Sequence, residues 1–348
     1  MVLTLTDEQR ELAASLRRFL ADKAPREAVR GWAESGNGVD PAVWRQLSEQ
    51  LGLTGVAIPE EYGGSGFGPV ELGVVLEEMG RVLLPGPFFG TVALAGQALV
   101  ASDDEAARRR WLPGIADGTR TATLAVNGST TANPAGDGWT LTGRKTLVVD
   151  GDTAELILVV AGDDLFAVEA GAAGLERRRL DALDITRTLG ALTFVDTPAV
   201  RVSAPVDRVV DLAVAALAAE QVGGASACLD QAVAYAKARV QFDRPIGSFQ
   251  AIKHKCADLL LEVEAARSAA LYARSAEPDE LAVSAAVAGS YCAGAYTHAA
   301  KENIQIHGGI GFTWEHDAHL HLKRAKSGER LLGSPVAHRR RLAALVGI

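Results

Sequence analysis

The pattern of hydrophobic and polar positions changes twice along the chain, and its first part is helical. Four apolar residues fall on one helical face just after the capping signal Thr6-Asp7-Glu8-Gln9, namely Leu12, Leu16, Phe19 and Leu20. Later runs with the same period predict helices at about 41–51, 69–83, 94–100 and 106–112. We therefore expect residues 1–117 to form an N-terminal α-helical domain.

Between Thr119 and about Val202 the pattern changes to short strands. Runs of this kind occupy 121–126, 139–143 and 155–160. Asn, Asp and Gly separate them at short spacing, which favours an antiparallel barrel or sandwich over alternating β and α units. No dinucleotide glycine fingerprint follows these strands, which argues against a nicotinamide-binding fold. Residues 118–203 are therefore expected to form a β domain.

The rest of the chain is helical again. Long runs at about 207–239, 248–276 and 279–307 precede two shorter ones after Asp317. Long antiparallel helices with short loops are typical of an up-and-down bundle, so a C-terminal four-helix bundle is expected at 204–348. Apolar residues nearly all round Leu212–Val222 indicate burial at a subunit contact as well as in the core. The predicted fold class is α+β.

Composition narrows the function classes. A net charge of −8 gives no reason to expect a nucleic-acid partner. The longest clean apolar stretch, Leu212–Ala219, is too short to span a membrane, and the first residues lack a signal-peptide pattern. The three cysteines have no metal-ligand spacing and are interpreted as small buried hydrophobes, so we expect a cytoplasmic protein without a metal site.

Two stretches in the C-terminal part carry candidate chemistry. Arg239 ends a helical run beside the bend Arg244-Pro245-Ile246-Gly247, where its planar guanidinium could meet a phosphate. On this segment alone, an arginine that serves the helix dipole and solvent is as good an interpretation. The second stretch, Gln305–Phe312, ends a helix in three glycines, which allow a backbone to approach a ligand closely.

In this order, with about fifty residues of helix between them, the two stretches closely resemble the C-terminal domain of the acyl-CoA dehydrogenase family. Two further motifs match the family, Pro59-Glu60-Glu61-Tyr62-Gly63-Gly64 and Trp139-x-Leu141-x-Gly143-x-Lys145. The resemblance covers nearly the whole chain. It implies that residues 118–203 form an antiparallel β-barrel. It also implies an FAD cofactor, an acyl-CoA substrate, and an electron-transfer flavoprotein or similar acceptor.

The resemblance also assigns the flavin site. In the family an arginine–phenylalanine turn and a Gln-x-x-Gly-Gly segment bind the FAD pyrophosphate, each completed by a neighbouring subunit, so a homo- or hetero-oligomer (dimer or tetramer) is implied. The matching positions are Arg239, Phe242, Gln250, Gln305, Gly308 and Gly309, and Thr146 should approach the isoalloxazine ring. Asn127–Thr131 stands roughly in place of the family's Thr-Glu-Pro-Gly-x-Gly-Ser-Asp loop, which is absent.

The catalytic base is the main departure from the family. Dehydrogenating an acyl thioester needs a base that removes the α-proton and an electron sink that accepts hydride from the β-carbon. No side chain accepts hydride, so a flavin must be the electron sink. The two family positions for the glutamate base correspond to Ala213 and Leu332, and neither side chain accepts a proton. Glu220 remains the candidate base, about 10 Å along the helix from Ala213 on roughly the same face. Alternatively, Glu220 is a structural carboxylate paired with an arginine or with the neighbouring subunit.

Three hypotheses for function follow. The first is an active acyl-CoA dehydrogenase of fatty-acid or steroid side-chain β-oxidation, with Glu220 as a relocated base. The second is a non-catalytic or half-site subunit of a heteromeric dehydrogenase, whose partner supplies the glutamate. The short length, the missing loop and Leu332-Gly333-Ser334-Pro335 look similar to subunits of two-chain family members that act on steroid side-chain thioesters. The third is another flavin reaction on the same scaffold, such as an oxidase or hydroxylase.

Overall fold

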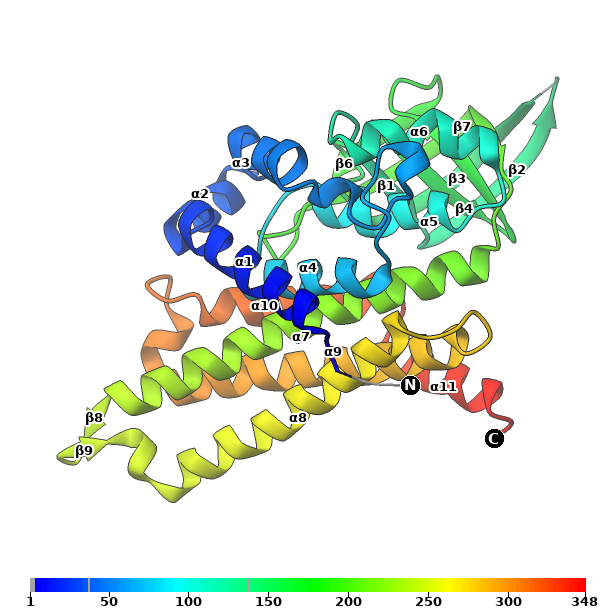
Figure 1. Cartoon of the computed structure of the whole chain (residues 1–348). Coiled ribbons are helices and arrows are strands. Elements are labelled where there is room, and N and C mark those ends of the chain that lie inside the picture. The colour runs from blue at the N-terminus through cyan, green and yellow to red at the C-terminus, as the bar shows by residue number, and fades with distance from the viewer. Residues whose placement is uncertain (1–3, 37, 137) are drawn as a thin grey trace. The chain divides into compact units, whose positions relative to one another are not determined.

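The computed structural model describes residues 4–36, 38–136 and 138–348, and its contacts divide the chain into two compact units (Figure 1). The helical unit consists of the described residues up to Arg26, Gly73–Leu84 and Leu217–Ile348. The mixed unit consists of Glu27–Leu72 and Pro85–Ala216. Helices α4 (Pro69–Arg81) and α7 (Val206–Ala238) run through both units. Because each unit joins segments that are far apart in the sequence, the domain boundaries expected near residues 117 and 203 stay a prediction.

The helical unit is built mainly from the predicted C-terminal helices. Besides α7 it contains α8 (Gln250–Arg274), α9 (Leu281–His307), α10 (Ala318–Leu331) and α11 (Pro335–Leu345). The helix positions expected from hydrophobic periodicity are confirmed to within a few residues. In the described residues this region has three long helices and two shorter ones, so the expected four-helix bundle is not confirmed.

Helix α1 (Asp7–Lys23) begins where its capping signal predicts. The Thr6 hydroxyl accepts a hydrogen bond from the Gln9 amide at 3.3 Å, and the Gln9 side chain accepts one from the Thr6 amide at 2.9 Å. These reciprocal bonds satisfy two donors that a helix start leaves free. Leu16 and Leu20 are buried, which confirms the predicted apolar face.

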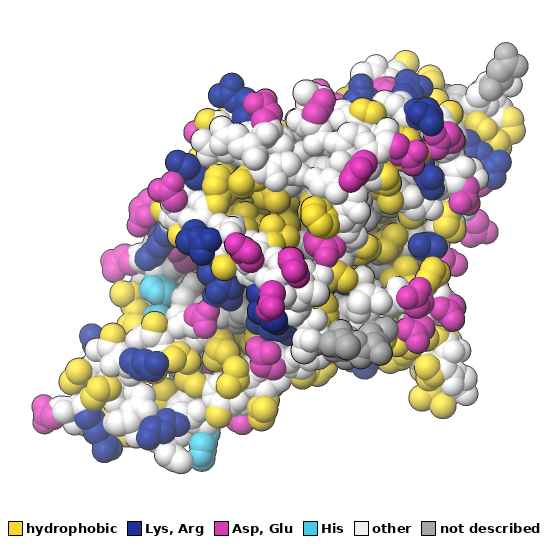
Figure 2. All heavy atoms as spheres, in the orientation of Figure 1, with side chains coloured by type: hydrophobic (Ala, Val, Ile, Leu, Met, Phe, Trp, Pro, Cys, Tyr) yellow, Lys and Arg dark blue, Asp and Glu magenta, His cyan; other side chains and the backbone are white. Residues whose placement is uncertain are grey.

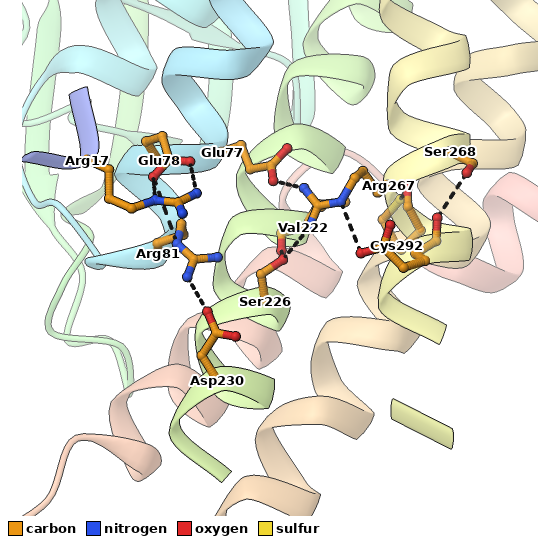
Figure 3. A network of polar contacts seen from close by, with 12 residues as sticks. Arg17, Glu77, Glu78, Arg81, Val222, Ser226, Asp230, Arg267, Ser268 and Cys292 are labelled. Carbon is orange, nitrogen blue, oxygen red and sulfur yellow. Dashed lines mark hydrogen bonds and ion pairs between the residues drawn. The ribbon is translucent and has the colours of Figure 1, made fainter. Parts of the chain in front are cut away.

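Ion pairs tie α1, α4, α7 and α8 together within the helical unit (Figure 3). Three arginines from α1, α4 and α8 pair with carboxylates of α4 and α7: Arg17 with Glu78, Arg81 with Asp230, and Arg267 with Glu77. Glu77 and Glu78 are buried, so their charges need these partners. Helices α4 and α7 also approach closely, since a Cβ added at Gly223 would lie 1.9 Å from the Glu77 carbonyl oxygen.

A buried polar network lies deeper in the same unit. Nδ1 of His321 is 3.0 Å from the Tyr296 hydroxyl, and its Nε2 is 3.4 Å from the Gln231 side-chain nitrogen. The Asn303 amide donates to the Gln231 carbonyl oxygen at 2.9 Å. Burial, with a smaller contribution from Arg324, lowers the pKa of His321 to about 3. The imidazole is therefore neutral in the folded protein across the physiological pH range.

This neutral histidine predicts a loss of stability in mild acid. Between about pH 6.5 and the folded pKa, the unfolded chain takes up a proton that the folded chain excludes, so stability falls as pH falls. The slope is at most about 1.4 kcal/mol per pH unit for one such group. We expect His321→Gln to flatten the dependence of melting temperature on pH between about pH 6.5 and about pH 4.

The mixed unit combines short helices with a sheet. Its helical segments are α2 (Arg26–Ser35), α3 (Pro41–Arg45), π-helical turns at Gln46–Gln50 and Phe89–Gly96, short 3₁₀ turns at Leu53–Gly55 and Glu60–Tyr62, α5 (Gln97–Val100) and α6 (Glu105–Ala116). Helix α2 was not predicted, because its ten residues bury only Val29 and Ala33. The expected helix at 41–51 is present but widens to π-helical geometry at Gln46.

Seven strands form the sheet, which are β1 (Ala122–Ala125), β2 (Gly128–Ala135), β3 (Gly138–Val149), β4 (Leu156–Ala161), β5 (Asp164–Glu169), β6 (Leu175–Arg179) and β7 (Leu189–Val202). Their order is β1-β4-β5-β7-β3-β2, with β6 on β7. β1 and β4 pair in parallel, so the expectation of a wholly antiparallel sheet is wrong there. The β2–β3 hairpin lies between β1 and β4 in the sequence, so the chain passes through two further strands before β4 pairs with β1. No ladder joins β1 to β2 in the described residues, so a closed barrel is not confirmed.

Helix α7 is the part of the described chain that is long and apolar enough to cross a membrane. Its most apolar window has a mean hydropathy of 1.5, yet 94% of that window is buried inside the protein. A core helix passes the same test, so the composition of α7 is weak evidence for a membrane span.

Candidate active site

The two segments predicted to bind the FAD pyrophosphate lie at the same end of the helical unit. Ala236 near the end of α7 and Ile306 near the end of α9 belong to one hydrophobic cluster, and Ile252 at the start of α8 packs against that cluster. The hairpin that follows α7 and the glycine segment that follows α9 are therefore neighbours. In Figure 1 this end is marked by the β8 and β9 labels.

The hairpin places Phe242 in an unusual conformation. Strands β8 (Val240–Gln241) and β9 (Arg244–Pro245) pair through a two-residue turn, in which Phe242 and Asp243 have φ values of 55° and 63°. Two positive φ values are characteristic of a type I′ turn, which a bulky residue such as phenylalanine adopts only under strain. The Phe242 side chain is 85% exposed and makes a T-shaped contact with Phe249, with 6.0 Å between the ring centroids. Backbone strain of this kind clusters at ligand and partner sites.

Arg239 is available to a ligand. Its backbone is fixed, because its amide donates to the Tyr235 carbonyl and its carbonyl accepts from the Ile246 amide, both at 2.8 Å. Its side chain is exposed and makes no hydrogen bond or ion pair with any residue that the structure describes. The neighbouring Arg244 instead lies over the Phe249 ring, 4.1 Å from its centroid.

The Gln305–Gly309 segment is open in a similar way. Gly308 ends α9 with a φ of 63°, a conformation that favours glycine. Gly309 has no such conformational reason, and a Cβ added to it would meet no atom within 4 Å. The Gln305 side chain is exposed and has no hydrogen-bond partner among the described residues, whereas Gln250 contacts His254 at 3.1 Å. Gly309 thus leaves room for a ligand or a second chain, and the Gln305 side chain offers a free amide to it.

Sequence reasoning missed how apolar this end is. Phe312 and Trp314 follow the glycine segment and are 79% and 55% exposed, and Val240 in the hairpin is 53% exposed. Figure 2 shows hydrophobic side chains beside basic ones at the β8–β9 end of the molecule. The signal in the sequence was an aromatic residue directly after a glycine run. An exposed apolar surface of this kind is typical of a protein interface.

Glu220 forms a buried ion pair. Its carboxylate accepts a hydrogen bond from Nε of Arg324 at 3.0 Å, and a terminal nitrogen of the same guanidinium lies 2.9 Å from the carboxylate oxygen. Both side chains are 7% exposed, and Arg324 also donates to the Leu84 carbonyl at 3.3 Å. Protonation of Glu220 would leave a buried guanidinium without its counter-charge, which is costly. This arrangement matches the alternative in which Glu220 is a structural carboxylate paired with an arginine.

The two family positions for the base carry no carboxylate and differ in environment. Ala213 is buried in α7, with 1% exposure. Leu332 caps the end of α10 and precedes Gly333, whose φ is 106°. Neither position therefore supplies a group that could accept a proton.

Thr146 lies at an irregular point of β3 in the mixed unit. The β3–β7 register shifts between Lys145 and Val148, and Leu147 has a φ of 53°. A bulge of this kind changes the direction of the side chains around it. Thr146 is half-buried, and its amide donates to the Asn127 carbonyl at 3.0 Å. The predicted flavin-facing residue is thus bonded to the segment that replaces the family's flavin loop.

His307, beside the glycine segment, has a structural environment. Its ring stacks on Tyr235 and lies against His316, with centroid distances of 4.2 Å in both cases. Its Nδ1 lies 2.8 Å from the Asn303 carbonyl oxygen, and burial lowers its pKa. A neutral stacked imidazole at the end of α9 fixes the start of the glycine segment without contributing charge.

The chain matches known proteins over its full length. Two family models match, described as acyl-CoA dehydrogenase, N-terminal domain at residues 6–119 and C-terminal domain at residues 210–346. Acyl-CoA dehydrogenase IpdE2 of Mycolicibacterium smegmatis is 39% identical over 341 residues, which cover 97% of this chain and 99% of that protein. The similarity between the two proteins therefore extends over nearly the whole of both chains.

Solved structures agree with the sequence comparison. A chain of the Tcur3481–Tcur3483 steroid ACAD variant superposes with a TM-score of 0.91 at 34% identity and covers 99% of both chains. A chain of the ChsE4–ChsE5 complex from Mycobacterium tuberculosis superposes with a TM-score of 0.93 at 29% identity and covers 100% of this chain and 99% of that one. The resemblance inferred from the motifs is confirmed, and the chain belongs to the acyl-CoA dehydrogenase family.

Proposed function

We propose that the chain is a subunit of a heteromeric, FAD-dependent acyl-CoA dehydrogenase in which a partner chain supplies the catalytic base. The observation that carries this proposal is the buried Glu220–Arg324 ion pair. A general base must accept a proton at working pH, whereas Glu220 would lose its hydrogen-bonded counter-charge by doing so. The two family positions hold Ala213 and Leu332, and neither side chain can accept a proton. The hypothesis of a relocated base at Glu220 is correspondingly weaker.

The residues at the hairpin end fit the FAD pyrophosphate. The exposed Arg239 could bind it with a charge-assisted hydrogen bond, and Gln305 could add a neutral donor. The open space at Gly309 would let the backbone approach the phosphates. Phe242 and Gln250 would border this site. From the family resemblance we also propose that Thr146 approaches a flavin ring. Bound FAD would supply the electron sink that accepts hydride from the substrate β-carbon.

The comparisons support a two-chain assembly and a bulky substrate. Two of the similar structures are of a Tcur3481–Tcur3483 steroid ACAD and of a ChsE4–ChsE5 complex. We infer that this chain also assembles with a second chain and acts on a steroid side-chain CoA thioester, with an electron-transfer flavoprotein or similar acceptor for reoxidation. The exposed apolar residues at the hairpin end, Val240, Phe312 and Trp314, support the assembly, because an exposed apolar surface is typical of a protein interface.

The test is to purify the tagged chain with whatever chain accompanies it from its host, and separately alone. We expect the co-purified complex to be yellow and its flavin to be bleached anaerobically by a steroid side-chain CoA thioester. The chain alone should show no bleaching with that thioester or with fatty acyl-CoA. Glu220→Gln should lower the melting temperature, because Arg324 loses its counter-charge, while the folded complex keeps bleaching within a few fold of the wild type. If the isolated chain bleaches its flavin, and Glu220→Gln slows this by about 10²-fold or more, the relocated base is correct instead.

A further inference from the structure

Lys145 is a buried cation without a counter-charge. It lies in β3 of the mixed unit with 2% exposure and forms no ion pair with any described residue. Its ammonium donates to the Val126 carbonyl at 2.9 Å and to the Gly128 carbonyl at 3.4 Å. Burial lowers the pKa of Lys145 to about 8. An unpaired buried lysine is costly, so its place in this strand requires an explanation beyond packing.

The contacts of Lys145 form part of a larger arrangement. The Asn127 carbonyl, between the two that Lys145 binds, accepts from the Thr146 amide at 3.0 Å. Two adjacent residues of β3 therefore hold three successive carbonyls of Val126–Gly128. Gly128 completes the fit, because its φ is 115° and an added Cβ would lie 2.3 Å from the Arg144 carbonyl oxygen. The conformation of this segment is thus fixed from β3.

The segment fixed in this way carries groups that a ligand could use. The Thr130 hydroxyl, in β2 just beyond it, is buried and has no hydrogen-bond partner among the described residues. A buried hydroxyl without a partner is uncommon in a folded protein and indicates an additional binding partner. Thr146, on the other side of the same contacts, is the residue expected at the flavin ring.

We propose that Lys145 is a positioning residue for the flavin, which holds Val126–Gly128 in the conformation that the cofactor meets. The proposal rests on the FAD binding proposed above. In this chain Asn127–Thr131 replaces the longer flavin loop of the family. The lysine contact would fix the shorter segment by intramolecular bonds, so that the Thr130 and Thr146 hydroxyls meet FAD without reorganisation.

The test compares Lys145→Met with Arg144→Met in the co-purified complex. Methionine keeps the length and apolar packing of the lysine side chain while it releases both carbonyls. Arg144 is the adjacent residue, exposed and without a side-chain partner among the described residues, so its change removes the same charge from the same strand. Three quantities are measured: the Kd of FAD by fluorescence quenching, the visible spectrum of the bound flavin, and hydrogen exchange of 126–131 with and without FAD.

We expect Lys145→Met to raise the Kd of FAD at least about tenfold, alter the flavin spectrum and speed exchange at 126–131. Arg144→Met should match the wild type in all three. An unchanged Kd and spectrum in Lys145→Met would overturn the proposal and leave Lys145 a purely structural residue. If Lys145→Met does not fold, Lys145→Gln, which keeps one donor, decides by the same criteria. If neither folds, the flavin role is overturned. A wild type that binds no FAD would instead refute the proposed function.

Discussion

Replacing Arg324 by methionine is expected to lower the free energy of unfolding by roughly 3–5 kcal/mol, the usual range when one member of a buried ion pair is removed. Glu220 would keep its charge in a site where only 7% of its side chain is exposed, and the Leu84 carbonyl would lose a donor. Methionine retains most of the apolar volume, so the loss would reflect the uncompensated charge rather than a cavity. Denaturant unfolding of the apo-protein measures it directly.

The double variant Glu220→Gln/Arg324→Met separates the charge from packing. It removes both charges, so it should recover much of the stability that Arg324→Met loses. The exposed pair Arg109–Glu105, with side-chain exposures of 65% and 52%, is the matched control, and Arg109→Met should cost less than about 1 kcal/mol. A loss below about 1 kcal/mol in Arg324→Met would contradict the structural role of Glu220 and reopen its candidacy as a base.

The Glu220–Arg324 pair illustrates what sequence reasoning could and could not reach. The apolar run around Glu220 predicts that a carboxylate there needs a partner, and an arginine was one of the alternatives. Which arginine could not be predicted, because the two residues are 104 positions apart and on different helices. The pairing depends on how α7 and α10 pack, which no local pattern encodes.

Local signals performed well wherever the contacts are local. The capping box at Thr6 and the long C-terminal helices depend on residues within a few positions of each other. The bend expected at Arg244–Gly247 is shifted, since Arg244–Pro245 form strand β9 and the tight turn lies at Phe242–Asp243. The parallel β1–β4 pair and the open strand order depend on contacts across some thirty residues. Strand periodicity gives the face of a strand but not its neighbour, which is why the sheet topology was predicted only in outline.

Lys145 shows a related limit. In the sequence it is one letter of the Trp139–Lys145 motif, and lysines are rarely buried. Its burial follows from the bulge at Thr146–Leu147 and from the position of the Val126–Gly128 carbonyls, both of which are tertiary features. Sequence reasoning placed Thr146 at the flavin by resemblance, while the neighbouring lysine emerges only from the hydrogen bonds.

The proposed flavin site is best tested at Arg239, because that side chain has no partner to lose among the described residues. Arg239→Ala should therefore leave the melting temperature of the apo-protein unchanged. It should weaken FAD binding by roughly 1.5–3 kcal/mol, the value of one hydrogen bond to a charged group, which corresponds to about a 10- to 150-fold higher Kd. The measurement is FAD retained after gel filtration, together with the Kd from fluorescence quenching.

Arg244→Ala supplies the matched control for this experiment. Arg244 sits in the same exposed hairpin and carries the same charge, but its guanidinium lies over the Phe249 ring, 4.1 Å from its centroid. If long-range attraction between a basic hairpin and a dianionic ligand were sufficient, both variants would lose affinity equally and the loss would shrink at high salt. A direct phosphate contact predicts a large loss for Arg239→Ala and a small one for Arg244→Ala at any salt concentration. Equal FAD content in Arg239→Ala and wild type would remove Arg239 from the site.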